Sequence, residues 1–235
     1  DISSWDVSMV TDMSQMFLAT QALTQDIGSW DVGNVTNMSA MFAHNRNPPF
    51  EFENWYVSNV TNMSGMFWRT TNAGVPGSPS GTTTTNEIKI GSWDVSNVTD
   101  MSNMFGGTLL NDTTWNQLSI DDISNWDVSS VTTMQEAFAI KTDFNGDISN
   151  WNVSSVNSMR WMFGMASAFN QDISSWNVGS VTDMGNMFDQ ASAFNSDISN
   201  WDVRNVTNMR GMFKYATAFN QPLNLWNVSS ITNMS

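Results

Sequence analysis

The stretch DISNWDVSSVTTMQEAF, residues 122–138, contains two hydrophobic periods in succession. Trp126 and Val128 are two residues apart, so in an extended segment their side chains share one face, and Ile123 precedes them. The apolar residues between Val131 and Phe138 are then spaced at i, i+3, i+6 and i+7, which is helical spacing. The stretch therefore predicts a short strand, a turn and a short helical or 3-10 arc.

The same pattern recurs along the whole chain. Trp followed by an acidic or amide residue and then Val occurs at Trp5, Trp30, Trp93, Trp126, Trp151, Trp176, Trp201 and Trp226, with Trp55-Tyr56-Val57 as a variant. The spacing is 25 residues except for one gap of 38 and one of 33, which predicts inserted loops near residues 72–87 and 106–119. We expect residues 1–235 to form one repeat domain. Because the chain begins and stops partway through a unit, we also expect it to be a window of a longer repeat protein.

A single unit of this kind cannot bury its own apolar face, but stacked units can. The sequence thus predicts a repeat solenoid of the leucine-rich-repeat kind, with one short parallel strand and one helical or 3-10 arc in each of about nine 25-residue coils. Identical residues of successive coils would then lie above one another. The 12 Trp and 18 Met residues are expected to fill the core rather than to form a cofactor site.

Composition narrows the classes of function. The chain has 8 basic and 22 acidic residues and a formal net charge of −14, which argues against nucleic acid and anionic membranes as partners. No apolar run is long enough to cross a bilayer, so no direct membrane insertion is expected in this segment. The absence of Cys leaves the redox compartment undecided.

Two longer segments carry a family resemblance. SWDVSNVTDMSNMF, residues 92–105, and AFNQDISSWNV, residues 168–178, resemble the repeats of BspA-like leucine-rich repeat surface proteins, which contain the domain of unknown function numbered 285. The resemblance extends over all the units. It implies export, display at the cell surface and a role in adhesion, and it implies no chemical reaction.

The sequence offers no catalytic constellation. His44 is the single histidine, it lies in a polar stretch predicted to be a solvent-exposed loop, and there is no Cys to act as a nucleophile. Neither a nucleophile elbow nor a phosphate-binding loop is present. We therefore predict that the protein is not an enzyme and needs no cofactor, with calcium as the one ion to consider.

The outward position between Trp and Val is the first candidate binding surface. Like charges on adjacent strands repel one another, so either solvent screening or a bound calcium ion or basic ligand must offset the repulsion along this row. A second candidate lies beside the first insertion, and a Trp within the second insertion could stack on a sugar or pack over the core. The candidate binding residues are Asp6, Asp31, Tyr56, Asp94, Asp127 and Asp202 in the row, and Trp68, Arg69 and Trp115 near the insertions.

Two further sets of polar residues are candidate sites. Asp143, Asn145 and Asp147 resemble half of a calcium loop, although Asn and Asp in such loops more often hold a turn. In a secreted eukaryotic protein, N-x-S/T motifs would carry sugar. The predicted glycosylation sites are Asn34, Asn59, Asn97, Asn111 and Asn205.

Three functions remain open at this point. The first is an extracellular or cell-surface adhesion and recognition scaffold for protein or glycan, and the second is a structural subunit of an extracellular filament, fibre or sheath formed by copies of the chain. The third is ice binding through one Thr in most units, although these Thr residues would also suit helix N-caps. The Thr residues are Thr11, Thr36, Thr61, Thr99, Thr132, Thr182, Thr207 and Thr232.

Overall fold

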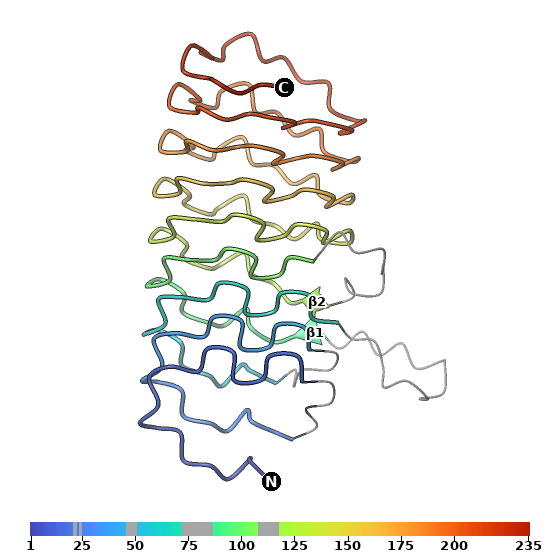
Figure 1. The fold of residues 1–235 in the computed structure, drawn as a ribbon. Coiled ribbons are helices and arrows are strands. Elements are labelled where there is room, and N and C mark those ends of the chain that lie inside the picture. The colour runs from blue at the N-terminus through green and yellow to red at the C-terminus, as the bar shows by residue number, and fades with distance from the viewer. Residues whose placement is uncertain (21–22, 24, 46–50, 72–86, 108–117) are drawn as a thin grey trace, which may run out of the picture.

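The backbone winds into coils that stack one upon the next, with the N- and C-termini at opposite ends of the stack (Figure 1). This computed structural model describes residues 1–20, 23, 25–45, 51–71, 87–107 and 118–235. Most of the two predicted insertions lies outside these residues. Among the described residues, no helix has the length and apolar character needed to span a bilayer.

Successive coils pair in parallel at two places in the unit, one before and one after the Trp-x-Val segment. The only strands in the described part are β1 (Glu87–Ile88) and β2 (Ser119–Ile120), which pair in parallel with Glu87 opposite Ser119 and Ile88 opposite Ile120. Elsewhere single bridges take the place of strands. One continuous series of parallel bridges joins Asp12, Asn37, Asn62, Asp100, Thr133, Ser158, Asp183, Asn208 and Asn233.

The predicted helical arcs are wrong for the described residues, which contain turns and no helix. In the coil at residues 172–196, the N–H groups of Asn186 and Gln190 donate to carbonyls of the next coil, both at 2.7 Å. The intervening Asp189 N–H donates to the carbonyl of Asn186, three residues back, at 3.1 Å. Asn186 and Gln190 also have positive φ angles of 55° and 61°, which a right-handed helix does not tolerate. The apolar residues therefore have helical spacing, but alternate N–H groups donate to the neighbouring coil, so no helix can form.

The predicted strand at Trp-x-Val is also wrong, because these segments form no strand in the described coils. Tight turns shape this side instead, as when the Trp176 N–H donates to the Ile173 carbonyl at 3.1 Å. Side chains join the coils here: each indole Nε1 donates to a backbone carbonyl of the preceding coil at 2.9–3.2 Å. The donors are Trp30, Trp55, Trp93, Trp126, Trp151, Trp176, Trp201 and Trp226.

The core consists of ladders of identical side chains. The prediction that Trp and Met would fill it is confirmed for most of the described residues, and Phe forms a further ladder. The rings of Trp126 and Trp151 stack with their centroids 6.4 Å apart and an angle of 6° between their planes. Within one coil, the ring centroids of Phe163 and Phe169 lie 3.8 Å apart and the two rings are nearly parallel. Met159 is completely buried. Full burial of such a side chain stabilises the fold by about 1.5–3 kcal/mol, so the stack is held mainly by this repeated apolar core.

The exposed Thr row does not cap helices. Thr36 donates its hydroxyl to the carbonyl of Thr11 at 3.1 Å, and Thr61 donates to Thr36 in the same way at 3.2 Å. Five further Thr residues repeat this contact down the stack, so the row is a ladder between coils. The N-cap interpretation is wrong because no helix begins there in the described coils.

Candidate functional site

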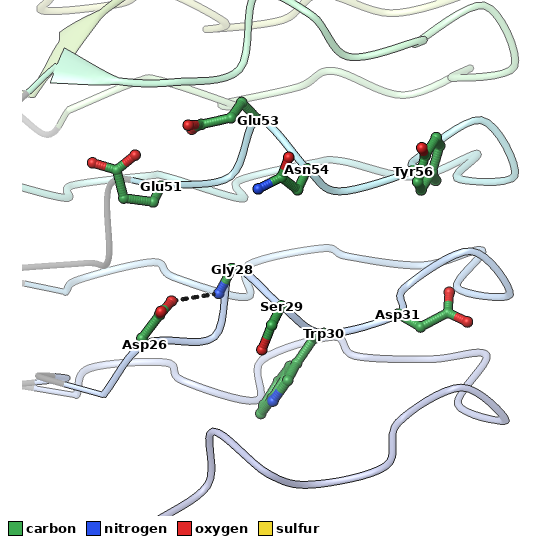
Figure 2. Close-up of a pocket in the computed structure, with 9 residues that line it drawn as sticks. All are labelled: Asp26, Gly28, Ser29, Trp30, Asp31, Glu51, Glu53, Asn54 and Tyr56. Carbon is green, nitrogen blue, oxygen red and sulfur yellow. Dashed lines mark hydrogen bonds between the residues drawn. The ribbon is translucent and has the colours of Figure 1, made fainter.

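A groove with a volume of about 660 Å³ lies between two adjacent coils near the N-terminal end of the stack. One coil contributes Asp26, Gly28, Ser29, Trp30 and Asp31, and the next contributes Glu51, Glu53, Asn54 and Tyr56 (Figure 2). Four carboxylates line the groove, and among the residues that the structure describes no basic side chain does. The groove is therefore an acidic surface with one aromatic edge.

The floor of the groove is fixed by a close approach of the two coils at Gly28. A Cβ atom on this residue would lie 2.7 Å from the carbonyl oxygen of Glu51, which is closer than atoms can pack. The Gly28 N–H donates to Oδ1 of Asp26 at 2.8 Å and so orients that carboxylate (Figure 2). Any larger residue here would push the coils apart.

Tyr56 interrupts the acidic row at the other end of the groove. It occupies the outward position that Asp31 occupies in the preceding coil, and 79% of it is exposed (Figure 2). Asp94 occupies the same position in the next unit. An exposed tyrosine ring flanked by carboxylates can stack on a sugar face or attract a cation, and the carboxylates can pair with that cation.

The rest of the outward row is held by local hydrogen bonds. Oδ1 of Asp6 accepts from both the hydroxyl and the N–H of Ser8, at 2.7 and 3.1 Å, and Asp94 makes the same pair of contacts with Ser96. In the same position Asp31 and Asp127 accept from the N–H two residues on, and Asp202 from the guanidinium of Arg204 at 2.8 Å.

These contacts favour the charged carboxylate. Hydrogen bonds from Ser8 lower the pKa of Asp6, those from Ser129 lower the pKa of Asp127, and that from the Arg204 side chain lowers the pKa of Asp202. At these three positions hydrogen-bond donors thus help offset the repulsion along the row, and the geometry alone does not require a bound ion.

Trp68 and Arg69 are packed into the stack and do not join the acidic row. The Trp68 Nε1 donates to the carbonyl of Gly107 at 3.2 Å. The Trp68 and His44 rings pack edge to face with their centroids 4.8 Å apart. The guanidinium carbon of Arg69 lies over the Trp68 ring, 5.7 Å from its centroid. Burial and the nearby Arg69 charge lower the pKa of His44, which is half-buried and not the exposed loop residue that was predicted. Trp115 lies outside the described residues.

The predicted metal ligands make other contacts. Asp143 pairs with Lys141 at 3.1 Å, Asn145 accepts from the N–H of Asn170 at 2.9 Å, and Asp147 accepts from the N–H of Ser149 at 2.9 Å. Among the residues that the structure describes, no group of three His, Cys, Asp or Glu side chains could hold a metal ion. Calcium binding stays a prediction.

Comparison with known protein families assigns the chain. The profile described as "Mycoplasma protein of unknown function, DUF285" matches residues 1–76, 78–184 and 155–235. The chain belongs to the DUF285 family. No curated protein and no solved structure matches it.

The predicted glycosylation sites of this DUF285 chain form part of the contact between its coils. Asn34, Asn59, Asn97 and Asn205 each donate Nδ2 to a carbonyl of the preceding coil at 2.7–2.8 Å. Asn111 lies outside the described residues. The motif that suggested sugar attachment therefore also serves the repeat.

Sequence reasoning missed a buried cation in this DUF285 chain. Lys141 is only 3% exposed and donates Nζ to the carbonyl of Leu118 at 2.5 Å, beside a second hollow of about 530 Å³. Burial lowers its pKa, and the carboxylate of Asp143 partly opposes that effect. Two later units have the buried residues Ala166 and Ala191 at this position. The sequence could therefore have indicated the site, because a lysine stands where the repeat has a small residue. In the groove, Asp26 was likewise missed.

Proposed function

We propose that the protein is a non-enzymatic adhesion or recognition scaffold, displayed outside the cell or on its surface, that binds protein or glycan. The resemblance of its repeats to BspA-like surface proteins supports the location and the role. The observation that carries the proposal is the groove in which Tyr56 replaces the acidic residue of the repeat, between Asp31 and Asp94.

The lining of the groove favours a cationic ligand. Asp26 and Glu51 lie at one end, Glu53 near the middle, and Asp31 beside Tyr56 at the other end (Figure 2). A Lys or Arg side chain of a partner protein, or the ammonium of an amino sugar, could pair with a carboxylate at either end of the groove. At the Tyr56 end it could also contact the tyrosine ring. The net charge of −14 would speed the approach of such a partner.

The test is binding of the wild type and two groove variants to arrays of proteins and glycans. Tyr56→Asn gives the residue that other units have at this position, as at Asn152 and Asn177, and removes the ring without adding a charge. Glu51→Gln with Glu53→Gln removes two charges from the groove. Asp127→Asn, in the same row but away from the groove, is the matched control. We expect both groove variants to lose at least ten-fold in affinity for basic ligands and the control to bind like the wild type.

Equal binding by all four proteins would contradict the groove as the site. The same array with calcium and then with a chelator tests the calcium prediction independently, since loss of binding on chelation would assign an ion to the row. Salt should weaken a carboxylate-mediated contact, which provides a further readout.

A structural subunit is the second candidate, favoured by the regular contacts that join successive coils. The hydroxyls of Thr182, Thr207 and Thr232 each donate to a carbonyl of the preceding coil at 3.1–3.2 Å. Coils of different copies that repeat such contacts could stack in the same way. Electron microscopy of the natural full-length protein tests this candidate: ordered fibres would support it, and dispersed particles would contradict it.

A further inference from the structure

The N-x-S/T motifs of this chain differ in what their acceptor nitrogen does. At Asn34, Nδ2 lies 2.7 Å from the carbonyl oxygen of Ser8 in the preceding coil and donates to it. Asn59, Asn97 and Asn205 make the same contact at 2.7, 2.8 and 2.8 Å. A sugar on any of these nitrogens would have to share the space between two coils with a hydrogen bond that joins them.

Asn152, in the motif Asn152-Val153-Ser154, has the opposite arrangement. Its side chain is exposed, and its Oδ1 accepts from the hydroxyl of Ser154 at 2.7 Å and from the Ser154 N–H at 3.2 Å. Within the described part of the chain, Nδ2 of Asn152 has no hydrogen-bond partner. The carbonyl end of the amide is therefore fixed by the hydroxyl residue of the motif itself, while the nitrogen faces solvent.

The remaining motifs are less suitable or lie at the limits of the stack. Asn37 donates Nδ2 to Asp12 at 3.1 Å, and Asn62 is half-buried in the series of parallel bridges. Asn227 and Asn233 belong to the last coil, and Asn111 lies outside the described residues. Asn34, Asn59, Asn97 and Asn205 are also exposed, so what sets Asn152 apart among the described motifs with coils on both sides is an exposed asparagine whose Nδ2 makes no hydrogen bond.

We propose that Asn152 is the preferred acceptor of an N-linked sugar, in place of the four ladder asparagines that the sequence predicted. The donor would be a sugar diphosphate, either nucleotide- or lipid-linked. A bond forms between Nδ2 and C1 of the sugar, the C1–O bond to the phosphate breaks, the diphosphate leaves with the electron pair, and the Nδ2 proton passes to solvent. This inference does not depend on the acidic groove.

The experiment compares folded protein with its own peptides. A soluble asparagine glucosyltransferase and a nucleotide-diphosphate glucose are incubated with the native protein and, separately, with its proteolytic peptides. Mass spectrometry then gives the rate of modification at each motif. The peptide rates correct for the preference of the enzyme for local sequence. We expect the native-to-peptide ratio at Asn152 to exceed the ratio at Asn34, Asn59, Asn97 and Asn205 by at least ten-fold.

A gain-of-site variant tests the geometry independently. Asn177 occupies the position of Asn152 in the next coil, with its Oδ1 accepting from the Gly179 N–H at 3.1 Å, but Gly179 provides no hydroxyl. A Cβ atom at residue 179 would lie 3.2 Å from Oδ1 of Asn177, so Gly179→Ser needs only a small adjustment. We expect this variant to be modified at Asn177 in the native state and Asn152→Gln to lose only its own site. If Asn152 is as protected as the ladder asparagines, or if Gly179→Ser leaves Asn177 unmodified in folded protein, the proposal is wrong.

Discussion

The indole nitrogen of Trp151 donates a hydrogen bond to the backbone carbonyl of Ile123, 3.1 Å away in the preceding coil. Both residues are at least 96% buried, so no water can replace the donor. The same contact recurs from Trp30 to Trp226 and compensates for the missing backbone pairing on the Trp side of the stack.

Trp151→Phe should therefore destabilise the protein. The variant keeps an aromatic ring but removes one of the two donors to the Ile123 carbonyl, which retains the Trp126 N–H at 3.1 Å. The expected cost is about 0.5–1.5 kcal/mol in the free energy of unfolding. Urea denaturation followed by circular dichroism measures the change. The control is Trp5→Phe in the first coil, where 53% of the residue is exposed and a change within about 0.5 kcal/mol is expected. Equal effects at both positions would contradict the role of the hydrogen bond.

Glu136→Gly should stabilise the fold. Glu136 has a φ of 57°, and Gly65 occupies the equivalent position of another unit with a φ of 61°. A left-handed conformation costs a residue with a side chain about 1–2 kcal/mol, and the greater freedom of glycine in the unfolded chain returns part of that, so a gain of about 0.5–1 kcal/mol is expected.

The reverse change provides the control for this prediction. A Cβ atom on Gly65 would meet nothing closer than 3.6 Å, so Gly65→Ala adds backbone strain without a clash. We expect it to lower the melting temperature, while Glu136→Gly raises it. If both variants lose stability, packing and not backbone conformation decides the choice of residue here.

Asp127→Asn should make the protein less sensitive to acid. The folded pKa of Asp127 is below its unfolded value of 3.8, so its stabilising contribution is fully present above that pH and is lost as the pH falls through the folded pKa. Asparagine occupies this position in the next two coils, at Asn152 and Asn177, and its Oδ1 accepts the same N–H without titrating. The wild type should have the higher urea midpoint near neutrality, and the two midpoints should converge as the pH falls toward 2. If the urea midpoint of the variant fell with acid as steeply as that of the wild type, the lowered pKa of Asp127 would be contradicted.

Lys141→Met should remove a pH dependence on the alkaline side. Burial places the folded pKa of Lys141 below its ordinary value of 10.5, so the unfolded chain binds more protons between the two values and stability should rise with pH in that window. Met fills a similar volume without a charge, and its stability curve should be flatter there. Lys89→Met is the control, because Lys89 is exposed and Glu87 raises its pKa, so the rise should persist in that variant.

The repeat register and the core could be predicted from the sequence, but the side on which coils pair could not. Trp126, Met134 and Phe138 are buried as expected, because apolar periodicity reports burial directly. Backbone pairing depends on which N–H groups face a neighbouring coil. Left-handed residues such as Glu136 and Ile140 decide this, and they are not the glycines that would reveal such a conformation in a sequence.

Part of the candidate site could also be predicted from the pattern of the repeat. Asp31 and Tyr56 were identified because they share one position of the repeat, and a departure from a repeat is visible in the sequence. Asp26 and Glu51 occupy positions that become one surface only when two coils stack (Figure 2). The contacts of Trp68 with Gly107 and of Lys141 with Leu118 also join segments that are 39 and 23 residues apart.

The ladder of hydrogen bonds from Thr and Trp also determines how the chain would respond to force. Most contacts join a coil only to its neighbours, so tension applied at the two termini would load the outermost coils first and peel them off in order. Each detached unit would release about 80–90 Å of extended chain, at roughly 3.3–3.6 Å per residue. Such a stack would lengthen stepwise under load, while the coils not yet reached stayed folded.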